Sequence, residues 1–152
     1  QLRALAKNGG VIQICFLGGY VKAMPPVPER EKALKELEAK YGNIRQISDE
    51  ALRREAMAAR EAVNAKFPQA RPNVRDLVDH IDHVRDVVGI DHVGIGTDFD
   101  GGGGIVGCDD VSEMIHVTEE LIRRGYTDRE IEKVWGGNFF RVFERVIALA
   151  EK

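Results

Sequence analysis

Only two short segments of this 152-residue sequence have the composition of buried β-strands, and this scarcity constrains the fold more than any other feature. Residues 11–16 and 92–97 are short, largely apolar and contain β-branched side chains. Helical patterns separate them, which predicts parallel pairing in an α/β fold. Two strands alone would leave their edges unpaired, and a complete (β/α)₈ barrel takes about 250 residues. We therefore expect this chain to be part of a larger sheet.

The helix signals before the second strand-like segment include one strongly amphipathic pattern. Residues 2–7 have the composition of a helix end, and the Asn8-Gly9-Gly10 tripeptide is a stop signal. Asn73 is a suitable N-cap for a further helix. Its apolar residues recur at spacings of three and four, which predicts one packed face: Val74, Leu77, Val78, Ile81, Val84 and Val88.

Three more helices are expected after the second strand-like segment. Asp110 with Glu113 resembles a capping box that has Asp in place of Ser or Thr, and this helix is expected to run to Arg124. Thr127 with Glu130 is a regular capping box. The last helix is expected from about residue 138, with apolar residues at helical spacing: Phe139, Val142, Phe143, Val146 and Ile147.

A charge-rich stretch between residues 25 and 72 is bracketed by prolines and predicts a pair of helices. Its charges include Glu–Lys pairs four residues apart in the favourable order. Ser48 is a suitable N-cap for the second helix, which would run through Lys66. We expect residues 25–72 to form a helical insert within a domain that otherwise spans residues 1–152.

Composition excludes several classes of protein. Lys and Arg number 22 and Asp and Glu number 25, so the formal net charge is −3 and the basic footprint of a nucleic-acid binder is missing. No apolar run approaches the roughly 20 residues needed to span a bilayer, so no membrane span is expected. Cys15 and Cys108 form no CxxC motif and are expected to be free thiols. The sequence begins with Gln1 rather than Met, and we expect a processed or truncated start.

Asp98 and Asp100 come directly after the second strand-like segment. In α/β barrels the carboxyl ends of the strands form the catalytic edge. An aspartate that ends a buried strand is also costly to desolvate unless it is paired or bound. Asp98 is therefore a candidate catalytic residue, and Asp100 is a weaker candidate for binding substrate. The alternative is that Asp98 starts the glycine loop at 101–104 as an Asx turn.

Tyr20 follows the other strand-like segment, behind two glycines that allow the backbone to approach a ligand closely. Its phenol can hydrogen-bond a substrate carboxylate; the alternative is an ordinary, partly buried tyrosine. The glycine run at 101–104 lacks the Lys-Ser/Thr of a phosphate-binding P-loop. His80 and His83 have an HxxH spacing that can bind metal, but they lie beside the apolar stripe of a packing helix, which favours a structural role.

Three segments carry a resemblance to a known family: GGVI at 9–12 leading to Phe16 and Tyr20, DHIDH at 79–83 leading to DHVGIGTDFDG at 91–101, and GGNFFRVF at 136–143. Together they resemble the renal, or membrane, dipeptidase family of zinc metallopeptidases. The middle segment is the most specific, because its helix, strand and aspartate loop match in order and spacing. The similarity spans nearly the whole chain except the insert, which resembles bacterial members more than animal ones.

This resemblance implies a (β/α)₈ TIM-like barrel of the metal-dependent hydrolase type, in which two zinc ions serve the hydrolysis of dipeptides. It assigns the chain to the C-terminal part of the barrel, with residues 11–16 as the seventh strand and 92–97 as the eighth. The family's eighth-strand aspartate, which acts beside the metal-bound hydroxide and the scissile peptide, falls on Asp98. The tyrosine that contacts the carboxylate of the dipeptide falls on Tyr20.

The resemblance also implies that the zinc ligands lie outside this chain. The family's His-x-Asp pair, bridging Glu, two further histidines and carboxylate-binding arginine would precede Gln1. None of the histidines at 80, 83, 92 and 116 falls on a ligand position. We therefore expect this chain alone to bind no zinc and to be inactive.

Two functions follow as expectations. The chain is the C-terminal part of a zinc dipeptidase, or it is a non-catalytic fragment that assembles with a partner and lacks the metal site. In either case a missing N-terminal portion of the barrel, or a second copy of the chain, is expected to cover the open sheet. The compartment stays open between a cytoplasmic and an exported bacterial enzyme.

Overall fold

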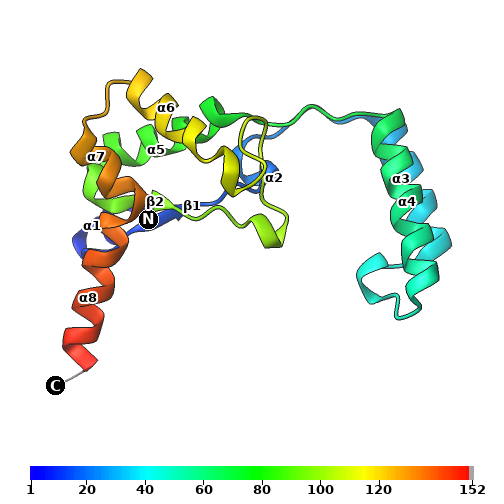
Figure 1. Cartoon of the computed structure of the whole chain (residues 1–152), viewed down its shortest axis with the longest axis horizontal. Coiled ribbons are helices and arrows are strands. Elements are labelled where there is room, and N and C mark those ends of the chain that lie inside the picture. Colours follow the sequence, from blue (N-terminus) through cyan, green and yellow to red (C-terminus); the bar gives the residue numbers. More distant parts are fainter. Residues whose placement is uncertain (151–152) are drawn as a thin grey trace. The chain divides into compact units, whose positions relative to one another are not determined.

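The computed structural model describes residues 1–150, which separate into two compact units (Figure 1). Unit 1 consists of Gln1–Ala23 together with the described chain from Arg71 onward, and unit 2 is Met24–Ala70. The composition is mixed α/β and mostly helical, which fits a part of a TIM-barrel-like fold. None of the helices within residues 1–150 combines the length and the apolar composition that a bilayer span requires.

Unit 2 contains two helices, α3 (Pro28–Tyr41) and α4 (Glu50–Lys66), joined through the 3₁₀ turn η1 (Ile44–Gln46). The predicted N-cap of the second helix is wrong by one residue. Asp49, not Ser48, precedes the first turn of α4, and its carboxylate accepts a hydrogen bond from the Leu52 backbone N–H at 2.7 Å. Ala56 is the one buried residue of α4, so polar and charged side chains cover most of this unit.

The sheet of unit 1 consists of two parallel strands, β1 (Ile12–Ile14) and β2 (Val93–Ile95). Ile12 pairs with Val93 and Ile14 with Ile95, so these apolar side chains share one face of the sheet. The ladder is shorter than the two apolar segments suggest. Beyond it the chains stay side by side, because the Gly96 N–H donates to the Ile14 carbonyl at 2.9 Å.

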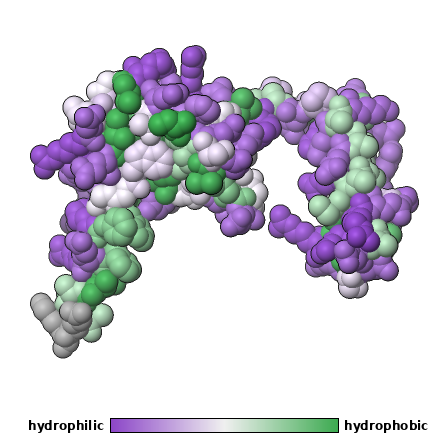
Figure 2. All heavy atoms as spheres, viewed as in Figure 1, coloured by the Kyte–Doolittle hydropathy of each residue, from purple (hydrophilic) through white to green (hydrophobic). Residues whose placement is uncertain are grey.

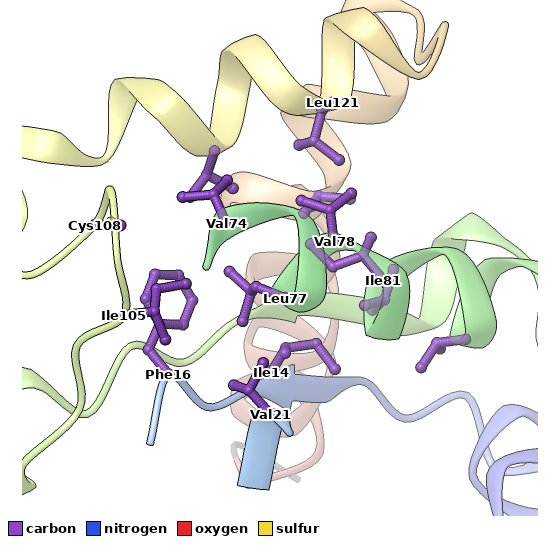
Figure 3. Packing of buried hydrophobic residues seen from close by; sticks show 14 of the residues in the cluster. Ile14, Phe16, Val21, Val74, Leu77, Val78, Ile81, Ile105, Cys108 and Leu121 are labelled. Carbon is purple, nitrogen blue, oxygen red and sulfur yellow. The ribbon is translucent and has the colours of Figure 1, made fainter. Parts of the chain in front are cut away.

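The helix α5 (Val74–Val88) provides the core with its apolar stripe, as the sequence predicts (Figure 3). Leu77, Val78 and Ile81 are completely buried, and Phe16 and Ile105 pack in the same cluster. The predicted cap of α5 is confirmed, since the Asn73 side chain accepts from the backbone N–H of residues 75 and 76 in a capping box. Its sequence therefore determines both the start of α5 and its buried face.

The remaining elements of unit 1 are short except at the C-terminal end: α1 (Leu2–Lys7), α2 (Gly18–Val21), η2 (Ile90–His92), η3 (Phe99–Gly101), η4 (Val111–Glu113), α6 (Ile115–Arg123), α7 (Asp128–Glu132), the π-helical turn η5 (Lys133–Gly137) and α8 (Asn138–Ala150). The Thr127–Glu130 capping box is confirmed. Asp110 does not cap an α-helix. Its carboxylate accepts from the Ser112 N–H and caps η4 instead, while the Glu113 carboxylate accepts from the Asp109 N–H.

One face of α8 is apolar and exposed (Figure 2). We call this face the α8 stripe, and its residues are between 43% and 62% exposed: Phe139, Phe140, Phe143, Val146, Ile147 and Leu149. Aromatic contacts link Phe139 to Phe140 and to Phe143 along the helix. The stripe therefore packs mainly on itself among the residues that the structure describes.

Candidate functional site

The loops that follow β1 and β2 are hydrogen-bonded to each other at the carboxyl edge of the sheet. The Phe16 N–H donates to the Thr97 carbonyl at 2.9 Å, and the Gly104 N–H donates to the Phe16 carbonyl at 3.0 Å. The rings of Phe16 and Phe99 meet edge to face, with centroids 5.8 Å apart. These contacts bring the segment before Tyr20 next to the loop that carries Asp98.

Asp98 has an unusual backbone conformation for an aspartate. Its φ of 68° and ψ of 34° lie in the left-handed region, and within residues 1–150 no other residue except glycine has a positive φ. Its backbone carbonyl accepts from the N–H groups of Gly101 and Gly103, at 3.1 and 2.6 Å. The backbone carbonyl of Asp98 therefore accepts the hydrogen bonds at the start of the loop, and its side chain forms no Asx turn. Conformations of this kind gather at functional sites, which keeps Asp98 as the leading candidate.

Glycines allow the Asp98 loop to fold this tightly. A β-carbon at Gly101 would overlap the Asp98 carboxylate, and one at Gly103 would overlap the Thr97 carbonyl oxygen. The carboxylate of Asp98 is exposed, and its side-chain partner within residues 1–150 is the Cys15 thiol, with Sγ 3.8 Å from Oδ2. The Cys15 sulfur also accepts from the Leu17 backbone N–H at 3.4 Å.

Tyr20 lies in α2, which begins after Leu17, and not in an open loop as its glycines suggest. The Tyr20 N–H donates to the Leu17 carbonyl at 2.8 Å, so a single helical turn carries the phenol past the end of β1. The side chain is 74% exposed, which excludes the alternative of a partly buried tyrosine. Asp100 lies in η3 with an exposed side chain. No hydrogen bond joins Tyr20 or Asp100 to Asp98 among the described residues.

The sheet face opposite α5 carries a polar side chain that the sequence analysis did not single out. Gln13 pairs with Gly94 on this face, and a β-carbon at Gly94 or Gly96 would overlap the Gln13 side chain. Cys15 follows on the same face by the two-residue period of a strand. In the sequence, Gln13 and Cys15 alternate with the apolar residues at 12, 14 and 16. This alternation is the signal that could have identified both residues as candidates on this face.

Three of the four histidines, and Cys108, have structural partners. His80 Nε2 lies 2.7 Å from the Val21 carbonyl, His92 Nδ1 lies 2.8 Å from the Gly10 carbonyl, and His116 Nδ1 lies 2.7 Å from the Gly107 carbonyl. Cys108 is buried in the core, and burial raises the pKa of its thiol to about 11. Both cysteines are free thiols. Within residues 1–150, no three His, Cys, Asp or Glu side chains gather in a group that could hold a metal ion.

Two curated dipeptidases are similar in sequence to this chain. The chain is 46% identical over 146 residues to Dipeptidase ataJ of Aspergillus terreus, which covers 95% of this chain and 25% of the relative. It is 43% identical over 81 residues to Dipeptidase 3 of Rattus norvegicus, which covers 53% of this chain and 17% of the relative. The chain thus spans a quarter or less of the length of these curated relatives.

A solved structure is similar over almost the same extent. The crystal structure of the probable dipeptidase PvdM from Pseudomonas aeruginosa matches 92% of this chain and 38% of the solved chain, at 37% identity and a TM-score of 0.63. The sequence model of the family described as membrane dipeptidase, Peptidase family M19, matches residues 1–152. This chain therefore belongs to the membrane dipeptidase family.

Proposed function

We propose that this chain is the C-terminal part of a (β/α)₈ zinc dipeptidase, with β1 and β2 as the seventh and eighth strands of its barrel. Similarity to dipeptidases over more than nine-tenths of the chain supports this assignment. The observation that carries the proposal is the position of Asp98. It follows the carboxyl end of β2 in a left-handed conformation, beside the loop that leaves β1.

The reaction is hydrolysis of the peptide bond of a dipeptide. Water adds to the carbonyl carbon, the C–N bond breaks, and a proton from the water must reach the leaving amine. The exposed carboxylate of Asp98 is suited to accept that proton and to return it to the amine. The phenol of Tyr20 donates a hydrogen bond to the free carboxylate of the dipeptide, and Asp100 adds a weaker polar contact to substrate.

Zinc is part of the proposal, but the described residues do not fit a zinc site. Structural and catalytic zinc sites take at least three protein ligands from His, Cys, Asp or Glu, and no such group exists within residues 1–150. The proposal therefore assigns the ligands of both zinc ions to a part of the protein outside this chain. The prediction that the chain alone holds no stoichiometric zinc is tested by elemental analysis, and two zinc ions per chain would contradict it.

The test of Asp98 uses the full-length protein that contains this chain. Asp98→Asn should keep the fold and the metal content while kcat falls by about 10²-fold or more, the usual scale for loss of a proton-transfer group. Asp128→Asn is the control, because it removes an exposed carboxylate from α7, which carries none of the candidate site residues. It should change kcat far less. Turnover near that of the wild type in Asp98→Asn would remove Asp98 from the mechanism.

The test of Tyr20 compares two substrates. A hydrogen bond to a charged group contributes about 1.5–3 kcal/mol, or roughly 10- to 150-fold. Tyr20→Phe should therefore reduce kcat/KM for a dipeptide by this factor, and reduce it far less for the same dipeptide with a C-terminal amide. Equal losses on both substrates would assign Tyr20 a packing role.

The exposed α8 stripe also supports a surface for a partner, which the dipeptidase and the alternative, a non-catalytic assembly module, would both need. Two apolar surfaces are exposed. One is the α8 stripe, and the other is a hollow of about 650 Å³ beside α1 and β1, lined in part by Leu2, Leu5 and Ile12. We propose that the remaining portion of the barrel covers both, because the chain spans only 17–25% of the length of its curated relatives. Sedimentation of the isolated chain tests this. A monomer at micromolar concentration that is as stable to urea as the full-length protein would contradict it, and a dimer would assign the surface to a second copy.

A further inference from the structure

We infer that Cys15 is a positioning residue whose thiol orients the carboxylate of Asp98 and ties it to the turn that carries Tyr20. This inference rests on the proposed function of Asp98 and names a residue that acts through it. The two residues lie 83 positions apart in the sequence and meet because β1 and β2 are adjacent parallel strands.

The Cys15 sulfur has two partners, one on each side of the candidate site. Its S–H donates to Asp98 Oδ2 at a distance of 3.8 Å, and its sulfur accepts from the Leu17 backbone N–H at 3.4 Å. Leu17 is the residue from which α2 starts, and the Tyr20 N–H donates to its carbonyl. One side chain thus contacts the catalytic candidate and the first residue of the turn that holds the substrate-binding candidate.

The surroundings of Asp98 leave its carboxylate few other restraints. Its backbone carbonyl is already bonded to the N–H groups of Gly101 and Gly103. Gly101, which faces the carboxylate, has no side chain that could donate to it. Within residues 1–150 the Cys15 thiol is the side-chain hydrogen-bond partner of this carboxylate. Because a proton-transfer group must be held near its productive geometry, loss of the thiol should lower turnover.

The expected effect is modest, because a thiol is a weak donor and a sulfur a weak acceptor. A net contribution at the scale of one hydrogen bond corresponds to a loss of about 2- to 10-fold in kcat. The binding of substrate should change little, since the turn that carries Tyr20 is also held by backbone hydrogen bonds from Tyr20 and Val21 to the Leu17 carbonyl. The signature of a positioning role is therefore a lower kcat with an unchanged KM.

The experiment compares three variants of the full-length enzyme on one dipeptide: Cys15→Ala, Cys15→Val and Cys15→Ser. Alanine and valine cannot donate a hydrogen bond and bracket the side-chain volume of cysteine from below and above, whereas serine keeps a donor in a smaller side chain. Cys15→Ala and Cys15→Val should each lower kcat about 2- to 10-fold at constant KM. Cys15→Ser should stay within about twofold of the wild type. Wild-type kcat in Cys15→Val would overturn the inference and assign Cys15 a packing role.

A double variant separates this inference from the role of Asp98. If Cys15 acts through Asp98, then adding Cys15→Val to Asp98→Asn should reduce kcat no further. A further 2- to 10-fold loss in the double variant would overturn the inference while leaving Asp98 in its role. Wild-type activity in Asp98→Asn alone would instead remove Asp98 from the mechanism, and the inference about Cys15 with it.

Discussion

The helices α5 and α8 have the same kind of sequence and opposite surroundings. Both carry apolar residues at spacings of three and four, and both lie in unit 1 (Figure 1). In α5 these residues are buried, with Leu77 and Ile81 completely covered. In α8 they form the exposed α8 stripe, in which Phe140 and Val146 are each 58% exposed. Helical periodicity therefore identifies an apolar face, but it does not identify the surface that covers this face.

The two helices are also attached by different interactions. The start of α8 is bound through polar groups: the buried Asn138 side-chain amide donates to the carbonyls of Ile90 and Val93, at 2.6 and 2.8 Å. Arg141 donates to the carbonyls of Gly9 and Asp91. Thus α8 depends on a few hydrogen bonds at its first turns, whereas α5 depends on burial along its whole length.

Along one flank, α5 contacts a charged network centred on Arg124. This guanidinium donates to Asp79, Asp82 and Glu120, and the Tyr126 hydroxyl donates to Asp82 at 2.6 Å. Burial favours the neutral form of Asp82, but hydrogen bonds from Tyr126 and Arg124 outweigh it and keep the pKa of this carboxyl below its usual range. The network therefore adds polar contacts between α5 and the end of α6 to the apolar core in which Leu121 of α6 packs.

The largest expected effect comes from the same substitution made on each helix. Leu77→Ala removes a completely buried side chain and should lower the free energy of unfolding by about 2–5 kcal/mol. Leu149→Ala removes a side chain that is 62% exposed and should change it by less than about 0.5 kcal/mol. Urea denaturation of the purified chain measures both. Similar losses of unfolding free energy in the two variants would show that another surface covers the α8 stripe in solution.

The next largest effect concerns the polar attachment of α8. Asn138→Ala leaves the carbonyls of Ile90 and Val93 without their side-chain donor and should destabilise the chain by about 2–3 kcal/mol. In Asn138→Ala, amide hydrogens should exchange faster in α8 than in α5. Arg145→Ala, an exposed change on the same helix, is the control and should be neutral. Equal exchange in α8 of Asn138→Ala and of the wild type would refute this mode of attachment.

The smallest expected effect is the pH dependence of the stability that the network beside α5 contributes. A hydrogen bond from Arg123 lowers the pKa of Glu120 most, and burial opposes it. With a further hydrogen bond from Arg124, the pKa falls from 4.5 to about 2. Because the pKa is lower in the folded state, this stabilisation is complete above pH 4.5 and is lost as the pH falls through about 2. The full difference corresponds to about 3 kcal/mol, and solvent screening at the exposed Arg123 side chain reduces it to on the order of 2 kcal/mol or less.

This third prediction is measured as a difference between two proteins. Urea denaturation between pH 5 and pH 2 should show a steeper loss of stability for the wild type than for Glu120→Gln, which lacks the titrating group. Parallel curves for the two proteins would contradict the assignment. Glu132→Gln is a matched control, because Glu132 is exposed and its loss should leave the slope unchanged.

Local sequence signals predicted most of unit 1. The capping residues Asn73 and Thr127 start the helices that the sequence indicates, because a side-chain cap depends only on residues within one turn. The cap assigned to Ser48 lies one residue later, because the neighbouring Asp49 carboxylate accepts the hydrogen bond. Asp110 does act as a cap, but of the 3₁₀ turn η4 before α6 and without the reciprocal bond from Glu113.

The candidate site could be predicted only in part. The position of Asp98 at the end of a strand is evident from the order of apolar residues and glycines. Its left-handed backbone and the contact with Cys15 are not, since both depend on how the loops after two distant strands pack together. The helical turn around Tyr20 was missed because two glycines in succession indicate a loop.

The sequence by itself determined the helices, the two strands, the buried face of α5 and the family to which the chain belongs. These depend on short-range periodicity, on capping and on motifs that lie together in the chain. Only the tertiary structure decided that the Cys15 thiol meets the Asp98 carboxylate, that three histidines contact backbone carbonyls, and that α8 leaves its apolar stripe exposed. Contacts between residues many positions apart depend on the register of β1 against β2 and on the packing of α5, which no local pattern contains.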